Sequence, residues 1–168
     1  MPKSDQRVDR LRFQIVPRTL IFVFNELGQV LLIKGAKARR VWAGKFNAIG
    51  GHIEAGEDIL ESASRELLEE TGLADVPLVF CGQVMIEVSQ NQGVGLFLFR
   101  GEVSSSVEVH ASEEGDLTWV AVDQVAALPV VEDLPELLSR VAHYTPGGEL
   151  VIGKYRYGPS GALEMLFH

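Results

Sequence analysis

The amino-acid sequence predicts an α/β sandwich built on a mixed β-sheet, and three observations lead to this fold class. Runs rich in β-branched, aliphatic and aromatic residues recur along the chain, as strands require. Segments with helix-capping signals lie between these runs. No repeat, low-complexity tract or Pro/Ser-rich linker interrupts them, so we expect one domain over residues 1–168. Strands and helices in this order are expected to pack as layers.

The first elements lie on either side of a turn signal. Residues 18–35, "RTLIFVFNELGQVLLIKG", contain two β-rich runs around "NELG", which predicts a hairpin. Residues 35–51 then mix cations, glycines and two aromatic residues. This composition is too irregular for a helix or a strand, but it suits a loop that approaches a ligand.

A helix is predicted from about residue 59 to residue 71. Asp58 and Glu61 form a D-x-x-E capping box at its start, and Gly72 supplies the stop signal. Apolar residues form the stripe that is expected to face the sheet, namely Ile59, Leu60, Ala63, Leu67 and Leu68. The charged face of the helix is expected to point the other way.

Similar signals define the remaining elements. Strands are predicted at 77–88, 94–103 and 117–122. Asp123 is expected to cap a short helix that runs through Ala127, and Pro135 suits the first turn of a longer helix in "LPELLSRVAHY". The last segment, about 149–167, predicts a hairpin around "GPSG".

The charge balance limits the partners of this protein. The chain has 15 Lys and Arg residues against 23 Asp and Glu residues, a formal charge of −8. Such acidity argues against a broad nucleic-acid surface, because that kind of binding depends on cations that neutralise phosphates. It still allows a small polyphosphate that arrives with a divalent metal ion, and solubility alone explains most of the charges.

Cysteine content and hydropathy indicate a soluble protein of a reducing compartment. The single cysteine, Cys81, lies between apolar residues and is interpreted as a core residue, which fits the cytoplasm. The first residues are polar and lack the apolar region of a signal peptide. No apolar run approaches the roughly 20 residues of a membrane span, so no membrane association is expected.

The predicted helix concentrates negative charge. Glu66, Glu69 and Glu70 are three and four residues apart, so the helix stacks them on one face. Their repulsion costs a few tenths of a kcal/mol per pair. Hard cations such as Mg²⁺ bind carboxylate oxygens, and a bound cation turns this repulsion into attraction. Arg65 can pair with Glu57, Glu61 or Glu69, whereas a merely solvated acidic face is the alternative interpretation.

The spacing of these residues resembles a known family pattern. Nine positions match G-x5-E-x7-R-E-U-x-E-E-x-G-U, in which U is a bulky apolar residue: Gly51, Glu57, Arg65, Glu66, Leu67, Glu69, Glu70, Gly72 and Leu73. On this motif the sequence resembles the Nudix hydrolases, and looser similarity extends from about Arg18 to Leu138. The resemblance implies a Nudix-type α/β/α sandwich that binds Mg²⁺ or Mn²⁺ and hydrolyses a nucleoside diphosphate linked to another group X.

The resemblance also implies roles for individual residues. The implied metal ligands are Glu66, Glu69, Glu70 and the backbone carbonyl of Gly50. Glu57 and Arg65 correspond to the supporting catalytic pair. Glu114 resembles a carboxylate that family members place opposite the motif as a further ligand or general base, and its neighbour Glu113 is the competing choice. Phosphate contacts are expected among Lys34, Lys37, Arg39, Arg40 and Lys45, although ordinary surface exposure also explains each of them.

The expected substrate is a small nucleotide, and three positions correspond to residues that read its base. "WAGKFNAIGGHIE" is similar to a segment of the 8-oxo-purine nucleoside triphosphate hydrolases, in which Asn47 corresponds to the residue that reads the base. Glu132 and Asp133 correspond to two adjacent acids of the base pocket in that branch, where one protonated and one ionised carboxylate recognise an oxidised purine.

The sequence departs from that branch at three positions, the first of which is Glu132, a glutamate in place of the usual first acid. Val131 stands where an aromatic side chain commonly stacks on the base, so Trp42 or Phe46 is expected to supply the stacking. His52 replaces a lysine that is common in that branch, so a phosphate contact there is expected to depend on pH or to be lost.

These observations favour one function and leave two alternatives open. The favoured function is divalent-metal-dependent hydrolysis of a (deoxy)nucleoside triphosphate, modified or canonical in its base, to the monophosphate and pyrophosphate. One alternative is a diphosphatase for ADP-ribose or another nucleotide sugar or dinucleotide. The other is a non-catalytic nucleotide sensor, but the presence of all three glutamates speaks against it.

Overall fold

The fold is organised around one mixed β-sheet in a computed structural model that describes residues 12–36, 42–110 and 115–168. The strands in these segments are β1 (Gln14–Asn25), β2 (Gln29–Gly35), β3 (Phe46–Asn47), β4 (Val79–Ser89), β5 (Gln92–Val103), β6 (Gly115–Ala121), β7 (Val151–Tyr157) and β8 (Leu163–Phe167). The helices are α1 (Ile59–Thr71), the short 3₁₀ helix η2 (Val122–Ala127) and α2 (Leu134–Ala142).

The sheet contains both parallel and antiparallel pairs. Within the described segments its strand order is β3-β2-β1-β5-β4-β7-β8, and β6 also pairs with β2. β1 runs parallel to β5 along its whole length, from Gln14 opposite Gln92 to Asn25 opposite Val103, and β7 runs parallel to β4. The other pairs of this order are antiparallel, so the predicted mixed sheet is confirmed.

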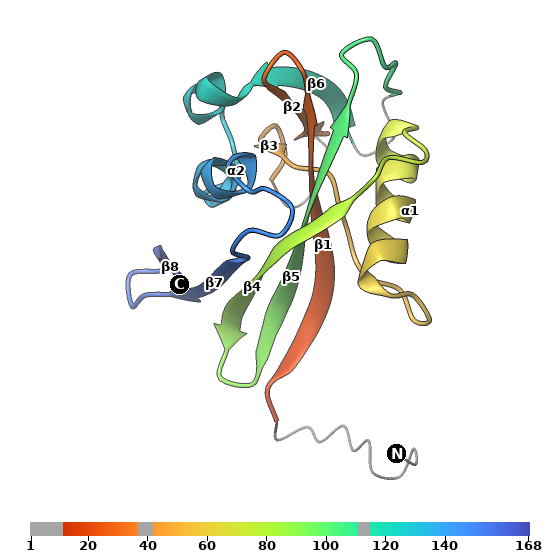
Figure 1. The fold of residues 1–168 in the computed structure, drawn as a ribbon. Coiled ribbons are helices and arrows are strands. Elements are labelled where there is room, and N and C mark those ends of the chain that lie inside the picture. Colours follow the sequence, from red (N-terminus) through yellow and green to blue (C-terminus); the bar gives the residue numbers. More distant parts are fainter. Residues whose placement is uncertain (1–11, 37–41, 111–114) are drawn as a thin grey trace.

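Helices cover the two faces of the sheet. Figure 1 shows α1 on one side of β1 and β5 and α2 on the other. The core on the α1 side contains Ile21, Val23, Ile33, Ala63 and Leu67 among its buried residues. The core on the α2 side contains Phe22, Leu98, Leu134, Leu137 and Tyr155, together with Cys81 as expected. This arrangement is the expected α/β/α sandwich.

β1 and β2 pair only next to their turn and then separate. The loop before α1 lies beside β1 where β2 has left it. β1 and β2 are in register at Phe24 opposite Val30, after which β2 continues along β6. The chain around Ile49–His52 takes the place of β2 beside β1. The N–H groups of Ile21 and Thr19 donate to the carbonyls of Ile49 and Gly51 at 2.8 and 2.9 Å. The glycines before α1 are thereby fixed to the central strand of the sheet.

The boundaries of α1 agree with the capping signals. The Asp58 carboxylate accepts hydrogen bonds from the N–H groups of Leu60 and Glu61 at 2.8 and 2.9 Å, and the Glu61 carboxylate accepts from the N–H of Asp58. Gly72 ends the helix with φ of 77°, a left-handed conformation that favours glycine. Its N–H donates to the Leu68 carbonyl at 2.8 Å.

The burial of α1 corrects the expected apolar stripe. Ala63 and Leu67 are buried, but Leu60 and Leu68 are 47% and 49% exposed. Glu70 is only 3% exposed, so the expectation that every charge points away from the core is wrong. The reason is that this side of α1 also packs against the glycine-containing loop, which supplies a polar partner for the Glu70 carboxylate.

Several predicted boundaries are approximately right, and one predicted cap is wrong. β1 and β5 start earlier than expected, at Gln14 and Gln92. The reason is that these two strands pair with each other over their whole length. Asp123 does not cap η2, whose N-cap is Ala121 without a side-chain hydrogen bond. Pro135 lies in the first turn of α2 as predicted.

The C-terminal hairpin forms as predicted and extends the sheet beyond β4. The N–H of Gly158 donates to the Ala162 carbonyl at 2.9 Å across its turn. Among the described helices, none is both long and apolar enough to span a membrane.

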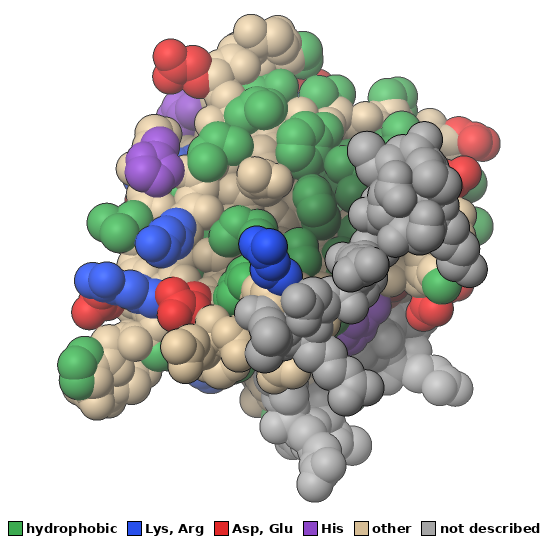
Figure 2. All heavy atoms as spheres, turned by 90° about the horizontal axis from the view of Figure 1, so that it is seen from below, with side chains coloured by type: hydrophobic (Ala, Val, Ile, Leu, Met, Phe, Trp, Pro, Cys, Tyr) green, Lys and Arg blue, Asp and Glu red, His purple; other side chains and the backbone are tan. Residues whose placement is uncertain are grey.

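The strands β1, β4 and β5 extend past the helices at one end of the sheet. At this end Phe13, which precedes β1, is 46% exposed. Val16 in β1 and Val88 in β4 are 47% and 60% exposed. Figure 2 shows the molecule from this end, with apolar side chains gathered on its surface. The strands therefore provide an open aliphatic wall next to the covered core.

The unequal burial of two adjacent leucines in α1 gives a test of this packing. We expect Leu67→Ala to lower the free energy of unfolding by about 2–5 kcal/mol, because it leaves a cavity in the core. Leu68→Ala, the matched control on the exposed side, should lower it by less than about 1 kcal/mol. Urea unfolding measures both values, and equal losses would contradict the orientation of the helix.

Candidate active site

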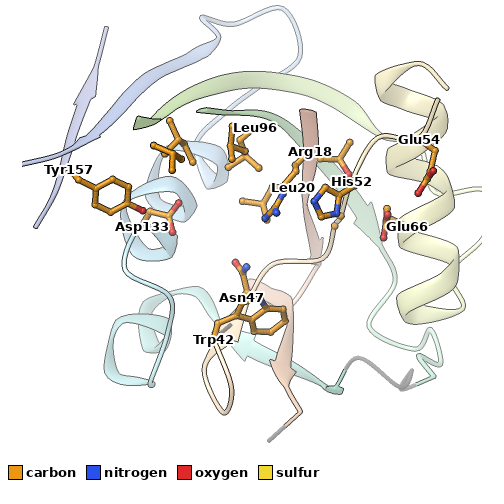
Figure 3. Close-up of a pocket in the computed structure, with 16 residues that line it drawn as sticks. Arg18, Leu20, Trp42, Asn47, His52, Glu54, Glu66, Leu96, Asp133 and Tyr157 are labelled. Atoms are coloured by element: carbon orange, nitrogen blue, oxygen red, sulfur yellow. The ribbon is translucent and has the colours of Figure 1, made fainter. Parts of the chain in front are cut away.

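A cavity of about 450 Å³ lies where the loop before α1 meets β1, β4, β5 and the start of α2. Glu54 and Glu66 line one end of it, beside Gly50 and Gly51. Asn47, Trp42, Asp133 and Tyr157 line the other end, as Figure 3 shows. Ile86, Val88, Val94 and Leu96 add an aliphatic wall to the lining. The cavity is thus acidic at one end and mixed polar and aromatic at the other.

Arg65 links the carboxylates of the acidic end. Its guanidinium donates two hydrogen bonds to Glu57, at 2.6 and 3.0 Å, in a bidentate arrangement. It also donates to Glu66 at 2.9 Å, to Glu69 at 3.1 Å and to the His52 carbonyl at 3.0 Å. The expected pairings of Arg65 with Glu57 and Glu69 are therefore present, whereas Glu61 serves the capping box.

These contacts change the proton affinities of both partners. The hydrogen bonds from Arg65, followed by the hydrogen bond from the Glu54 N–H, lower the pKa of Glu57 to about 2. The hydrogen bond to Glu57 in turn raises the pKa of Arg65, with smaller contributions from Glu66 and Glu69. The pair is fully ionised at neutral pH and acts as a fixed support for the helix face.

Two glycines bring the backbone against Glu66 and Glu70. The N–H of Gly50 donates to the Glu70 carboxylate at 3.0 Å. Gly50 has φ of 140°, and a Cβ at this position would collide with the Thr19 carbonyl. A Cβ on Gly51 would collide with the Glu66 carboxylate. A side chain at position 50 would therefore push the loop away from β1, and one at position 51 would displace the Glu66 carboxylate of α1.

The donor groups at this end fit a hard divalent cation. Glu66, Glu69 and Glu70 offer carboxylate oxygens on one helix, and Gly50 offers a carbonyl beside them. Across the described residues, no three His, Cys, Asp or Glu side chains already form a closed metal-binding group. Glu66 and Glu69 accept hydrogen bonds from Arg65, whereas Glu70 accepts one from the Gly50 N–H.

The other end of the cavity contains part of the expected base pocket. Asn47 and Asp133 both line it, from β3 and from the residue before α2. Burial raises the pKa of Asp133, and the neighbouring Glu132 adds to this effect. Glu132 itself is exposed and does not line the cavity, so the structure does not bring the two acids together in one pocket.

The aromatic residues divide between the cavity and the core. Trp42 lines the cavity, and its ring lies so close to Gly35 that a Cβ there would collide with it. Phe46 is 9% exposed and belongs to the core on the α2 side, so it is not available to stack on a ligand. His52 lines the cavity as expected.

Among the described residues, the two lysines expected to contact phosphate lie away from the cavity. Lys34 lies over the Phe46 ring, 5.5 Å from its centroid, and neither Lys34 nor Lys45 lines the cavity. The other expected residues lie outside the described segments, namely Lys37, Arg39, Arg40, Glu113 and Glu114.

Sequence patterns missed several residues of the cavity. Arg18 and Tyr157 lie far from the motif in sequence, and the sheet brings them to it from β1 and β7. The buried Thr19 hydroxyl also lines the cavity and makes no hydrogen bond within the described residues. The two-residue alternation of Ile86 with Val88 and of Val94 with Leu96 indicates a shared face, but it does not tell which face is open.

Comparison with known proteins identifies the class of protein. Residues 15–141 match the family model described as NUDIX domain, so the chain belongs to the Nudix family and is a Nudix hydrolase.

Individual relatives agree with this class. The "Oxidized purine nucleoside triphosphate hydrolase" of Danio rerio is 35% identical over 108 residues, which are 64% of this chain and 67% of that protein. The mouse (Mus musculus) protein of the same description is 36% identical over 112 residues, 64% of this chain and 67% of that protein. The crystal structure of a MutT protein from Bacillus halodurans covers 91% of this chain and 97% of its own, with 29% identity and a TM-score of 0.71.

A more distant neighbour shows the fold alone. The Nudix domain of Shewanella oneidensis NrtR, solved with ADP-ribose, is 15% identical and has a TM-score of 0.65. The match covers 83% of this chain and 96% of the Shewanella oneidensis chain.

The Glu57–Arg65 pair predicts a specific dependence of stability on pH. Because the folded pKa of Glu57 is depressed from 4.5 to about 2, the pair stabilises the fold above pH 4.5 and loses this effect as the pH falls towards 2. In EDTA, wild type should be more stable than Glu57→Gln at neutral pH, and the difference should shrink through that window. In an Arg65→Gln background Glu57→Gln should show a weaker pH dependence, because only the Glu54 N–H bond to Glu57 remains, and a wild-type difference that grew on acidification would refute the assignment.

Proposed function

We propose that this Nudix hydrolase cleaves a (deoxy)nucleoside triphosphate, with an oxidised or canonical purine base, to the monophosphate and pyrophosphate. The observation that carries the proposal is the single cavity that joins the carboxylate end of α1 to the Asn47 and Asp133 end. A nucleotide has the matching division into a charged phosphate chain and a flat base. The names of the Danio rerio and mouse relatives support a purine triphosphate over other substrates.

The cofactor in this proposal is Mg²⁺ or Mn²⁺, held by the carboxylates of Glu66, Glu69 and Glu70 and the carbonyl of Gly50. When bound, such a cation neutralises charge on phosphate oxygens and lowers the pKa of a water molecule. The oxygen donors of α1 are of the type that these cations prefer. Family membership supports the same choice, because Nudix hydrolases generally use divalent metals.

The protein's own residues then position the reacting groups. Arg65 holds Glu57, Glu66 and Glu69 in one arrangement through its four hydrogen bonds to these carboxylates. Water forms a new bond to phosphorus, the bridging P–O bond breaks, and pyrophosphate leaves with the electron pair. The proton of the water passes to a carboxylate, for which Glu114 is the proposed general base.

Base recognition is assigned to Asn47 and Asp133. The Asn47 amide can donate and accept hydrogen bonds, and a protonated Asp133 can do the same. Burial raises the pKa of Asp133, which is the direction that favours a carboxyl able to donate to the base. Trp42 and Tyr157 provide aromatic faces at the same end of the cavity. Glu132 is exposed, which supports a pocket with one acid rather than two.

Glu69 provides the direct test of hydrolysis. Its side chain is 60% exposed, so Glu69→Gln should leave the free energy of unfolding almost unchanged. Turnover with Mg²⁺ should fall by about a hundredfold or more, because the site loses a ligand charge. A nucleotide panel scored for pyrophosphate against orthophosphate release measures this, with the exposed Glu149→Gln as the control.

Three results of this panel would contradict the proposal or favour another function. Full activity of Glu69→Gln would refute the metal site. Activity on ADP-ribose or a dinucleotide alone would identify the alternative diphosphatase. Nucleotide binding without any product in wild type would identify a sensor.

Asn47→Ala and Asp133→Asn test base recognition. We expect each variant to change the ratio of kcat/KM for 8-oxo-dGTP and dGTP by about tenfold, because an unpaired polar group in the pocket discriminates strongly. The Mg²⁺ concentration for half-maximal rate should not change. Glu132→Gln is the matched control and should leave the ratio unchanged, because its side chain is exposed. Equal losses for all nucleotides would contradict a base pocket.

A further inference from the structure

Arg18 projects into the middle of the cavity. Figure 3 shows its side chain between Glu54 and Glu66 on one side and Asp133 and Tyr157 on the other. Among the described residues that line the cavity, Arg18 carries the one permanent positive charge. It is not part of the Nudix motif, and it reaches this position because β1 crosses the floor of the cavity.

The guanidinium of Arg18 differs from those of four other arginines. Arg65, Arg100, Arg140 and Arg156 each donate to a glutamate, at distances of 2.6–3.1 Å. Within the described part of the chain, no ion pair or side-chain hydrogen bond involves Arg18. Its donors are therefore available to a ligand, and a planar guanidinium matches two oxygens of one phosphate group.

The backbone on both sides of Arg18 is held in place. Arg18 lies opposite Leu96 in the parallel pairing of β1 with β5 and opposite His52 on the other side. The Pro17 carbonyl accepts from the Ile53 N–H at 3.2 Å, and the Thr19 N–H donates to the Gly51 carbonyl at 2.9 Å. Arg18 therefore has a fixed starting point relative to the loop that carries Gly50 and Gly51.

The charges of the cavity indicate which part of a nucleotide Arg18 would contact. Glu54 and Glu66 at one end of the cavity repel an anion that enters without compensation. In the proposed substrate orientation, the base lies by Asn47 and Asp133 and the distal phosphates lie by α1. The phosphate attached to the sugar then falls between the two ends, which is the place of Arg18.

We propose that Arg18 binds the phosphate attached to the nucleoside and so fixes the nucleotide between the base pocket and the acidic helix. This proposal rests on the proposed function for the direction in which the nucleotide lies. In this proposal the contact is made by a charge on β1, outside the Nudix motif.

The test compares ligands that differ by one phosphate group, in EDTA so that no metal contributes. Calorimetry measures the Kd of 8-oxo-deoxyguanosine and of its 5′-monophosphate for wild type, Arg18→Gln and Arg18→Lys. Arg12→Gln is the matched control, because it removes the same charge from an exposed residue outside the cavity lining. A parallel assay with Mg²⁺ and the triphosphate records pyrophosphate release.

We expect wild type to bind the monophosphate more tightly than the nucleoside. Arg18→Gln should weaken monophosphate binding by about tenfold to a hundredfold, the usual range for a hydrogen bond to a charged group. Nucleoside binding should change less than about twofold. Arg18→Lys should recover part of the loss, because it keeps the charge but not the fork of donors. Arg12→Gln should match wild type.

Several outcomes would overturn the proposal. An unchanged preference for the monophosphate in Arg18→Gln would show an ordinary solvated arginine, and an equal loss of nucleoside binding would assign Arg18 to the base. A wild-type protein that does not prefer the monophosphate also overturns it. The proposed function fails separately, if wild type releases no pyrophosphate although the affinity ratio depends on Arg18.

Discussion

The charge of one guanidinium organises the acidic helix of this protein. Three glutamates at helical spacing repel one another, and Arg65 offsets this repulsion by bonding to Glu57, Glu66 and Glu69 at once. Its fourth partner, the His52 carbonyl, belongs to the loop before the helix. The same contacts that stabilise the helix therefore join it to the loop, and they orient carboxylates that would otherwise move freely in solvent.

The loop itself depends on the opening of the first hairpin. Because β2 leaves β1 after a short pairing, the N–H groups of Thr19 and Ile21 become available to the carbonyls of Gly51 and Ile49. Glycine is required where the loop passes between β1 and α1, since side chains there would meet the Thr19 carbonyl or the Glu66 carboxylate. Gly50 and Gly51 therefore lie against both β1 and the glutamates of α1. The cavity forms directly beside them.

The two ends of the cavity are built in different ways. The acidic end is built from neighbours in sequence, whereas the other end draws Asn47, Asp133 and Tyr157 from β3, the start of α2 and β7. Such a division suits a family whose members share a reaction and differ in substrate. The aliphatic part of the lining has no polar side chain, so any polar recognition in the cavity rests on the few polar groups beside it.

Local patterns in the sequence determined α1, its caps, the strand positions and the acidic motif, because these depend on residues within a few positions of one another. They also selected Asn47, His52 and Asp133 through family resemblance. Only the tertiary structure decided that Leu60 and Leu68 are exposed, that Glu70 is buried and that Glu132 lies outside the pocket. It alone brought Arg18 to the centre of the cavity. The physical reason is that burial and neighbourhood depend on which strands pair, and the long-range parallel pairing of β1 with β5 leaves no local signal in the sequence.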